Sequence, residues 1–261
     1  MKYKTKILAE RFVSLLSQWP QVECICLNEA ADSDTLDPYF ALILDVYHNG
    51  DIPTPRERGE IYGNDAAALE TSSRGHKDRF LVGNLPVRLE YKSTRQIEEL
   101  VDIADENRKH LWLIKDSGTY GYYRLARGEI LFSRSSWIEG IRGRLLALDD
   151  DFWTQVRDAN QSKMEHYLSD LGAALIHDDQ FHYLVSSAMF IKSACLVLFC
   201  INKCFEPSHR GYYKKVLELP VLPESFKAQI ETFVREKSDL NMERKFSLAK
   251  LIAKNIIALQ H

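Results

Sequence analysis

The feature that most constrains the fold is a change in the spacing of apolar residues near residue 149. Before it, short apolar runs alternate with turn-forming residues, as in the strands of a sheet domain. After it, apolar residues recur at helical spacing over about 151–176, 180–203, 223–237 and 242–259. Strands first and helices second predict an α+β chain. We expect an α/β domain over residues 1–148 and an all-α four-helix bundle over residues 149–261.

The first half is expected to form a mixed β-sheet with flanking helices. Apolar residues at helical spacing predict a helix that ends at Pro20, and another helix begins at Thr94. Gly83-Asn84 lies between two apolar stretches and predicts a β-hairpin. Further strands are predicted at 22–27, 40–47, 112–114, 120–125 and 128–132, and a loop at 70–75.

Composition narrows the possible partners and the cellular location. The net charge is −3 and the pI is about 6.3, so no overall basic field favours nucleic acid. The five cysteines contain no CxxC pair, and their odd number favours a reducing compartment. The longest apolar run, 194–201, is far shorter than the ~20 residues of a membrane span. These features predict a cytoplasmic protein that binds neither membrane nor nucleic acid.

Asp45 is the residue that matters most for the chemistry of the predicted sheet, because it interrupts the apolar run at 40–47. A carboxylate in a buried strand must pair with a cation, bind a metal or take up a proton. Glu90 shares a strand face with Arg88 and Lys92 by alternation. Two interpretations stay open for these acids: a salt bridge with Arg88 or Lys92, or a functional carboxylate pair.

A second polar cluster is the basic segment 72–79. Its cations Lys77 and Arg79 are suited to holding phosphate groups. A charged surface loop explains the segment equally well.

Two segments carry a resemblance to a known family. Residues 37–47 (DPYFALILDVY) align without gaps on a motif strand of the polymerase-β-like nucleotidyltransferases. Residues 201–220, with INKCFEP and YYKK, resemble a segment of the helical bundle that follows in the aminoglycoside-type members. The resemblance implies a nucleotidyltransferase-like mixed-sheet domain followed by a bundle. It also implies transfer of a nucleoside monophosphate by a two-metal site.

The chain departs from the family at the residues that carry this chemistry. Asn28 and Glu29 stand where the family has a Gly-Ser turn for the triphosphate. Ala41 and Ile43 stand where it has paired aspartates, and neither offers an oxygen ligand to Mg²⁺. Simple loss of the metal site is the economical interpretation of this change.

Glu90 matches the third carboxylate of the family, and Asp45 offers a partial replacement for the missing pair. Asp45 lies on the strand face of Ile43, ~7 Å further along. A shifted site would use Asp45, Glu90 and an acid from residues 29–37.

Three hypotheses follow. The first is a divergent nucleotidyltransferase that acts on an NTP and an unknown acceptor, with Mg²⁺ between Asp45 and Glu90. Its nucleotide would be held by Asn28, Glu29, Lys77 and Arg79. The alternative is a catalytically inactive relative that binds a nucleotide or a protein partner. The third is an interaction module in which the bundle pairs with another chain.

Overall fold

The computed structural model describes residues 3–29, 42–63, 66–106, 108–209, 211–235 and 241–260. By their contacts the residues group into two compact units. The first takes the chain up to Arg108 together with Arg124–Ala147, and the second takes Lys109–Tyr123 and Leu148 onward. The division after residue 147 falls where the hydrophobic pattern changes, whereas residues 109–123 group with the helical unit.

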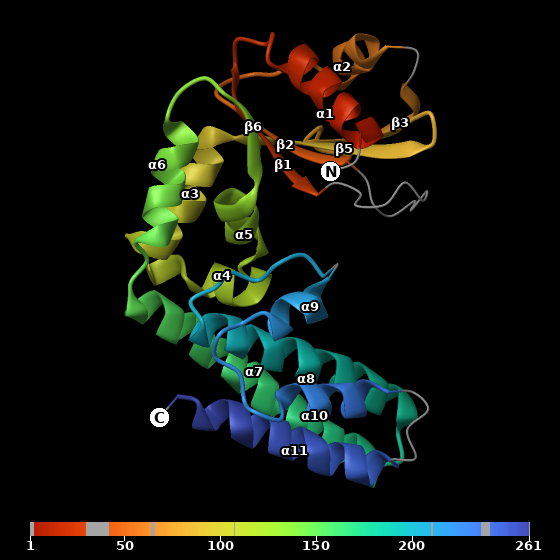
Figure 1. Cartoon of the computed structure of the whole chain (residues 1–261), viewed down its shortest axis with the longest axis vertical. Helices are drawn as coiled ribbons and strands as arrows, with labels where there is room; N and C mark the ends of the chain where they lie inside the picture. Colours follow the sequence, from red (N-terminus) through yellow and green to blue (C-terminus); the bar gives the residue numbers. More distant parts are fainter. Residues whose placement is uncertain are drawn as a thin grey trace. The chain divides into compact units, whose positions relative to one another are not determined.

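The first unit contains a six-stranded sheet of order β3-β4-β5-β2-β1-β6 (Figure 1). Strands β2 and β5 are parallel and the other neighbours are antiparallel, so the sheet is mixed, as predicted. The predicted hairpin joins β4 to β5 through Gly83, whose φ of 58° suits glycine. The strands are β1 (Val22–Glu29), β2 (Leu42–His48), β3 (Ala66–Thr71), β4 (Lys77–Val82), β5 (Leu85–Ser93) and β6 (Glu129–Ser133).

The two faces of this sheet differ in chemistry because side chains alternate along each strand. One face forms an apolar core with helices α1 (Tyr3–Leu16) and α2 (Pro55–Tyr62), and Phe12, Leu44 and Leu89 are fully buried there. Ile43, Asp45 and Tyr47 point to the opposite face. Figure 1 shows α3 (Thr94–Asp105) and α6 (Trp137–Leu146) on that side. The Tyr47 ring packs there against Trp137, with ring centroids 5.4 Å apart.

A buried charged network ties α2 to the hairpin. Arg58 donates from Nε and Nη2 to Asp78, at 2.8 and 3.0 Å, and from Nη1 to the Pro53 carbonyl at 2.9 Å. Tyr62 and Thr71 donate to the same carboxylate. Since both charges are buried and paired, this network has a structural role.

The second unit is helical, as the periodicity predicts. Its long helices are α7 (Asp150–Ile176), α8 (Gln180–Ile201), α10 (Phe226–Val234) and α11 (Met242–Ala258), with the shorter α9 (Tyr212–Leu217) between α8 and α10. Asp149, Asp179 and Asn241 cap α7, α8 and α11 through their side chains. Helix α8 is apolar and long enough to span a membrane by composition alone, and half of its most apolar stretch is buried.

Two predicted strands are wrong. Residues 112–114 lie in helix α4 (Trp112–Ser117), and residues 120–125 lie in helix α5 (Tyr120–Arg127). Their aromatic residues favour strands by propensity, but packing decides the outcome. Tyr122 lies against the rings of Phe152 and Phe205, with centroids 6.4 and 5.5 Å away. The predicted loop at 70–75 is also shorter than expected, because β3 extends to Thr71.

Candidate functional site

Asp45 and Glu90 lie side by side at the centre of the sheet. They are register partners in the parallel pair β2–β5, and Lys77 is the register partner of Glu90 in β4. The three side chains therefore form one row across three strands on the face opposite α1 and α2. Asp45 is fully buried and Glu90 is 8% exposed.

Arg124 of helix α5 connects the two carboxylates. Its Nη1 donates to Glu90 Oε2 at 2.7 Å, and its Nε donates to Asp45 Oδ2 at 3.0 Å. Its Nη2 also donates to Asp45 Oδ1. The planar guanidinium thus binds one acid through two nitrogens and the other through the third, a geometry that only arginine provides.

Asp45 has further donors on both oxygens. Lys92 Nζ lies 2.8 Å from Oδ1. Asn28 Nδ2 donates to Oδ2 at 2.6 Å, and the Tyr47 hydroxyl donates to the same oxygen at 3.2 Å. A buried carboxylate is expected to be satisfied in this way.

Glu90 meets further cations on both of its oxygens. Arg88 Nε lies 3.0 Å and Lys77 Nζ 3.6 Å from Oε1, and Lys92 Nζ lies 3.7 Å from Oε2. The Arg88 contact is an ion pair without a directed hydrogen bond. The two carboxylates therefore face four cationic side chains: Lys77, Arg88, Lys92 and Arg124.

This excess of positive charge sets the protonation of the cluster. Burial opposes ionisation of Glu90, but Arg124, Lys92, Arg88 and Lys77 together outweigh burial and lower its pKa below the ordinary value. Burial lowers the pKa of Lys92, against the raising effect of Asp45.

The predicted Mg²⁺ site does not fit these donors. A divalent cation needs carboxylate oxygens with free lone pairs in a negative environment. Here both acids are occupied by nitrogen donors, and among the described residues four cationic side chains face the two carboxylates. Within the described residues, no three His, Cys, Asp or Glu side chains form a group suited to a metal ion. The cation shared by Asp45 and Glu90 is the Arg124 guanidinium.

The predicted phosphate-binding cations lie together. Lys77 and Arg79 line a hollow of about 240 Å³ with Glu70, Thr71 and Ser72. Arg79 is exposed and lies next to Arg88 in the strand register. This region of the sheet face is accessible, unlike the buried Asp45.

The remaining predicted residues are placed differently. Asn28 is held against Asp45 rather than presented for a ligand. Glu29 ends strand β1, and its side chain lies outside what the structure describes. Ala41 and the acids at 32, 34 and 37 also lie outside the described residues. Ile43 is 1% exposed and shares the face of Asp45.

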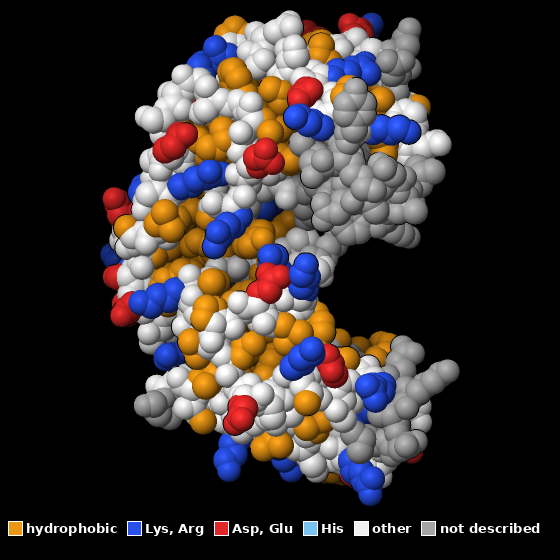
Figure 2. Space-filling view, viewed as in Figure 1, with side chains coloured by type: hydrophobic (Ala, Val, Ile, Leu, Met, Phe, Trp, Pro, Cys, Tyr) orange, Lys and Arg blue, Asp and Glu red, His pale blue; other side chains and the backbone are white. Residues whose placement is uncertain are grey.

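Charge on the visible surface is mixed. On the face in Figure 2, Lys and Arg side chains are dispersed among acidic and apolar ones rather than gathered over one element. Among the described residues on this face, no extended basic surface of the kind that nucleic acid would need is seen.

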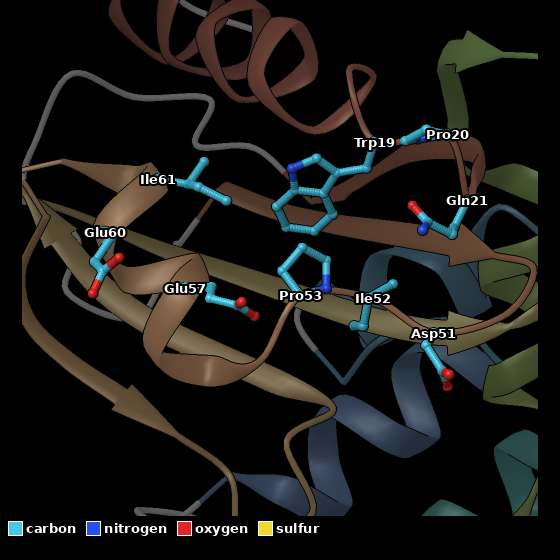
Figure 3. A pocket seen from close by; sticks show the side chains of 9 residues that line it. All are labelled: Trp19, Pro20, Gln21, Asp51, Ile52, Pro53, Glu57, Glu60 and Ile61. Atoms are coloured by element: carbon cyan, nitrogen blue, oxygen red, sulfur yellow. The ribbon is translucent and has the colours of Figure 1, made fainter.

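Another hollow of the first unit is separate from the charged cluster. It measures about 710 Å³ and has an apolar floor of Trp19, Ile52, Pro53 and Ile61 (Figure 3). Its other lining residues are Pro20, Gln21, Asp51, Glu57 and Glu60. The charged residues among these are acidic, so this hollow is unsuited to phosphate groups.

Comparison with known proteins gives a distant structural likeness. No protein-family model matches the chain, and no curated protein matches it. Among solved structures, it is similar to the crystal structure of a nucleotidyltransferase-like protein from Exiguobacterium sibiricum 255-15. The identity is 12%, the TM-score is 0.49, and the match covers 96% of this chain and 73% of that chain. At this identity no residue role transfers from one protein to the other.

Proposed function

We propose that this chain is a nucleotidyltransferase-like protein that binds the phosphate groups of a nucleotide and does not transfer the nucleotide. The observation that carries the proposal is the position of Arg124, which donates to Asp45 and Glu90 at once. A guanidinium there neutralises the acids that would otherwise hold a catalytic metal. The sequence resemblance at residues 37–47 and 201–220 supports the family, and its missing aspartates agree with lost catalysis.

The ligand half of the proposal rests on Lys77 and Arg79. Both line the 240 Å³ hollow on the accessible part of the sheet face. That volume is below the ~300–1,000 Å³ of sites that enclose a whole small molecule, so the hollow suits a phosphate group alone. Lysine and arginine supply a point charge and a planar donor fork for such an anion.

Titration calorimetry with ATP and GTP, in Mg²⁺ and then in EDTA, tests this function. The expected result is one dissociation constant in both buffers, since the protein's own cations neutralise the phosphates. The double variant Lys77→Ala/Arg79→Ala should weaken binding at least about tenfold, ~1.4 kcal/mol. Arg95→Ala is the matched control, because Arg95 is an exposed cation of the same unit paired with Glu99. Binding that disappears in EDTA would contradict the proposal.

A divergent nucleotidyltransferase is the second candidate, favoured by the direct register of Asp45 with Glu90. It requires Arg124 to withdraw from both acids. Asp45→Asn separates the two candidates. For the binding protein it should lower stability and leave nucleotide affinity unchanged. For the enzyme it should abolish metal-dependent nucleotide binding while the fold survives, and a radiolabelled NTP should transfer label with the wild-type protein only.

A further inference from the structure

The apolar hollow lined by Trp19, Ile52 and Ile61 is not used by the proposed function. Its volume of about 710 Å³ lies within the ~300–1,000 Å³ of sites that hold a whole small molecule. Three segments of the first unit form it: the turn between α1 and β1, the turn between β2 and α2, and α2 itself. Lys77 and Arg79 belong to β4, so this hollow and the proposed phosphate site are separate.

The floor of the hollow is apolar and firmly held. Trp19 stacks on Tyr91, with ring centroids 6.2 Å apart and an interplanar angle of 24°. Figure 3 shows the indole beside Ile61 and Pro53. Ile52, Pro53 and Ile61 are half-buried, so each keeps part of its apolar surface accessible. A floor of this kind suits the apolar body of a ligand.

The rim of the hollow is acidic. Asp51, Glu57 and Glu60 line it and are exposed, and its described lining residues include no Lys, Arg or His. Hydrogen bonds from the backbone and hydroxyl of Thr54 lower the pKa of Glu57, so this carboxylate is ionised at neutral pH. Arg56 lies 3.4 Å from Glu60, but both side chains are largely exposed and water screens the pair.

The nearby buried cation does not offset this rim. Arg58 donates to the Pro53 carbonyl at 2.9 Å, but Asp78 accepts two of its hydrogen bonds, at 2.8 and 3.0 Å, and neutralises it. The hollow therefore combines an apolar floor with a negative rim. That combination is complementary to a molecule with an apolar body and a positive charge.

We propose that this hollow binds a small organic cation, a protonated amine carried on an aromatic or aliphatic body. The body lies against Ile52, Pro53 and Ile61, and the ammonium group meets the carboxylates of the rim. Glu57 can accept a further hydrogen bond, because Thr54 uses only its Oε2 and a carboxylate has about four lone-pair sites.

Proton–nitrogen correlation NMR of the full chain, with tryptamine as the probe, tests the site. The chain has four tryptophans, and comparison with Trp19→Phe identifies the indole N–H signal of Trp19. A saturable shift of this signal is expected. Indole-3-propionate has the same aromatic body with a negative charge, and methylammonium has the charge without the body. Both should bind at least about fivefold more weakly than tryptamine.

Charge-neutral variants test the rim. Glu57→Gln removes the charge and keeps the cap of α2, because glutamine also serves in a capping box. Combined with Asp51→Asn, it should weaken tryptamine binding at least about threefold. Glu99→Gln is the matched control, since Glu99 is an exposed acid on α3 of the same unit, and it should leave the affinity unchanged. Circular dichroism melts verify that each variant is folded.

The test is independent of the proposed phosphate site. Lys77→Ala/Arg79→Ala should leave tryptamine binding unchanged, whatever it does to nucleotide binding. A Trp19 signal that tryptamine does not shift would overturn the proposal. Equal affinity for tryptamine and indole-3-propionate, or equal affinity of the wild-type protein and the Asp51→Asn/Glu57→Gln variant for tryptamine, would also overturn it.

Discussion

Replacing Arg124 with methionine tests whether the guanidinium holds the two buried acids. The variant keeps much of the side-chain volume and removes the hydrogen bonds to Asp45 and Glu90. Removing one member of a buried ion pair costs about 3–5 kcal/mol, because the other member is left uncompensated. Lys92 still contacts Asp45 at 2.8 Å in the variant. We therefore expect a loss in free energy of unfolding at the lower end of this range, about 3 kcal/mol.

Urea denaturation measures this loss as a lower midpoint with an unchanged slope. Arg127→Met is the matched control on the same helix; Arg127 is exposed, and its loss should cost within about 0.5 kcal/mol. A double-mutant cycle with Asp45→Asn should show a coupling of about 1–3 kcal/mol. If Arg124→Met lowers the free energy of unfolding no more than Arg127→Met does, and the cycle shows no coupling, the guanidinium does not hold these acids.

The pH dependence of the same variant has a defined sign. The pKa of Glu90 is lowered in the folded protein, so its stabilising contribution is present above the unfolded value of 4.5 and is lost as pH falls through the folded value. The loss in free energy of unfolding caused by Arg124→Met should therefore become smaller when the urea titrations are done below pH ~4.5. A cost that stays constant to acid pH would exclude this contribution.

Three further predictions concern buried polar groups. Asp78→Asn should lower the free energy of unfolding by about 3–5 kcal/mol, since Arg58 loses its buried counter-ion; urea titration measures this. Burial raises the pKa of Glu206, although the charges of Lys192 and His209 act to lower it. The free energy of unfolding of the wild-type protein should therefore fall as pH rises from 4.5 through the pKa of Glu206 in the folded protein. Glu206→Gln should remove that slope and add about 1–3 kcal/mol at neutral pH in thermal or urea unfolding. Gly118→Ala should cost about 1–3 kcal/mol by the same assay, because φ is 82° there and the new Cβ would lie 2.7 Å from Glu206 Oε2.

The elements that the sequence identifies correctly are those whose pattern is local. The hairpin at Gly83, the strand at β6 and the long helices follow from turn residues and hydrophobic period, which act over a few neighbours. Helices α4 and α5 fail for a definite reason. They are short, rich in aromatic residues, and stabilised by contacts such as Tyr122 with Phe205, which lie 83 positions apart in the chain.

The cluster around Asp45 and Glu90 shows the same division between what the local sequence predicts and what distant contacts decide. The sequence by itself determined that Asp45, inside an apolar strand, needs a partner, and it offered Lys92 and Arg88, which do contact the two acids. It did not indicate Arg124, which lies 79 residues from Asp45 and falls in a segment with a strand-like composition. Only the tertiary structure places the Arg124 guanidinium on both acids, because a metal ion and a guanidinium each satisfy a buried carboxylate. Which of them is present depends on where a distant helix delivers its side chain.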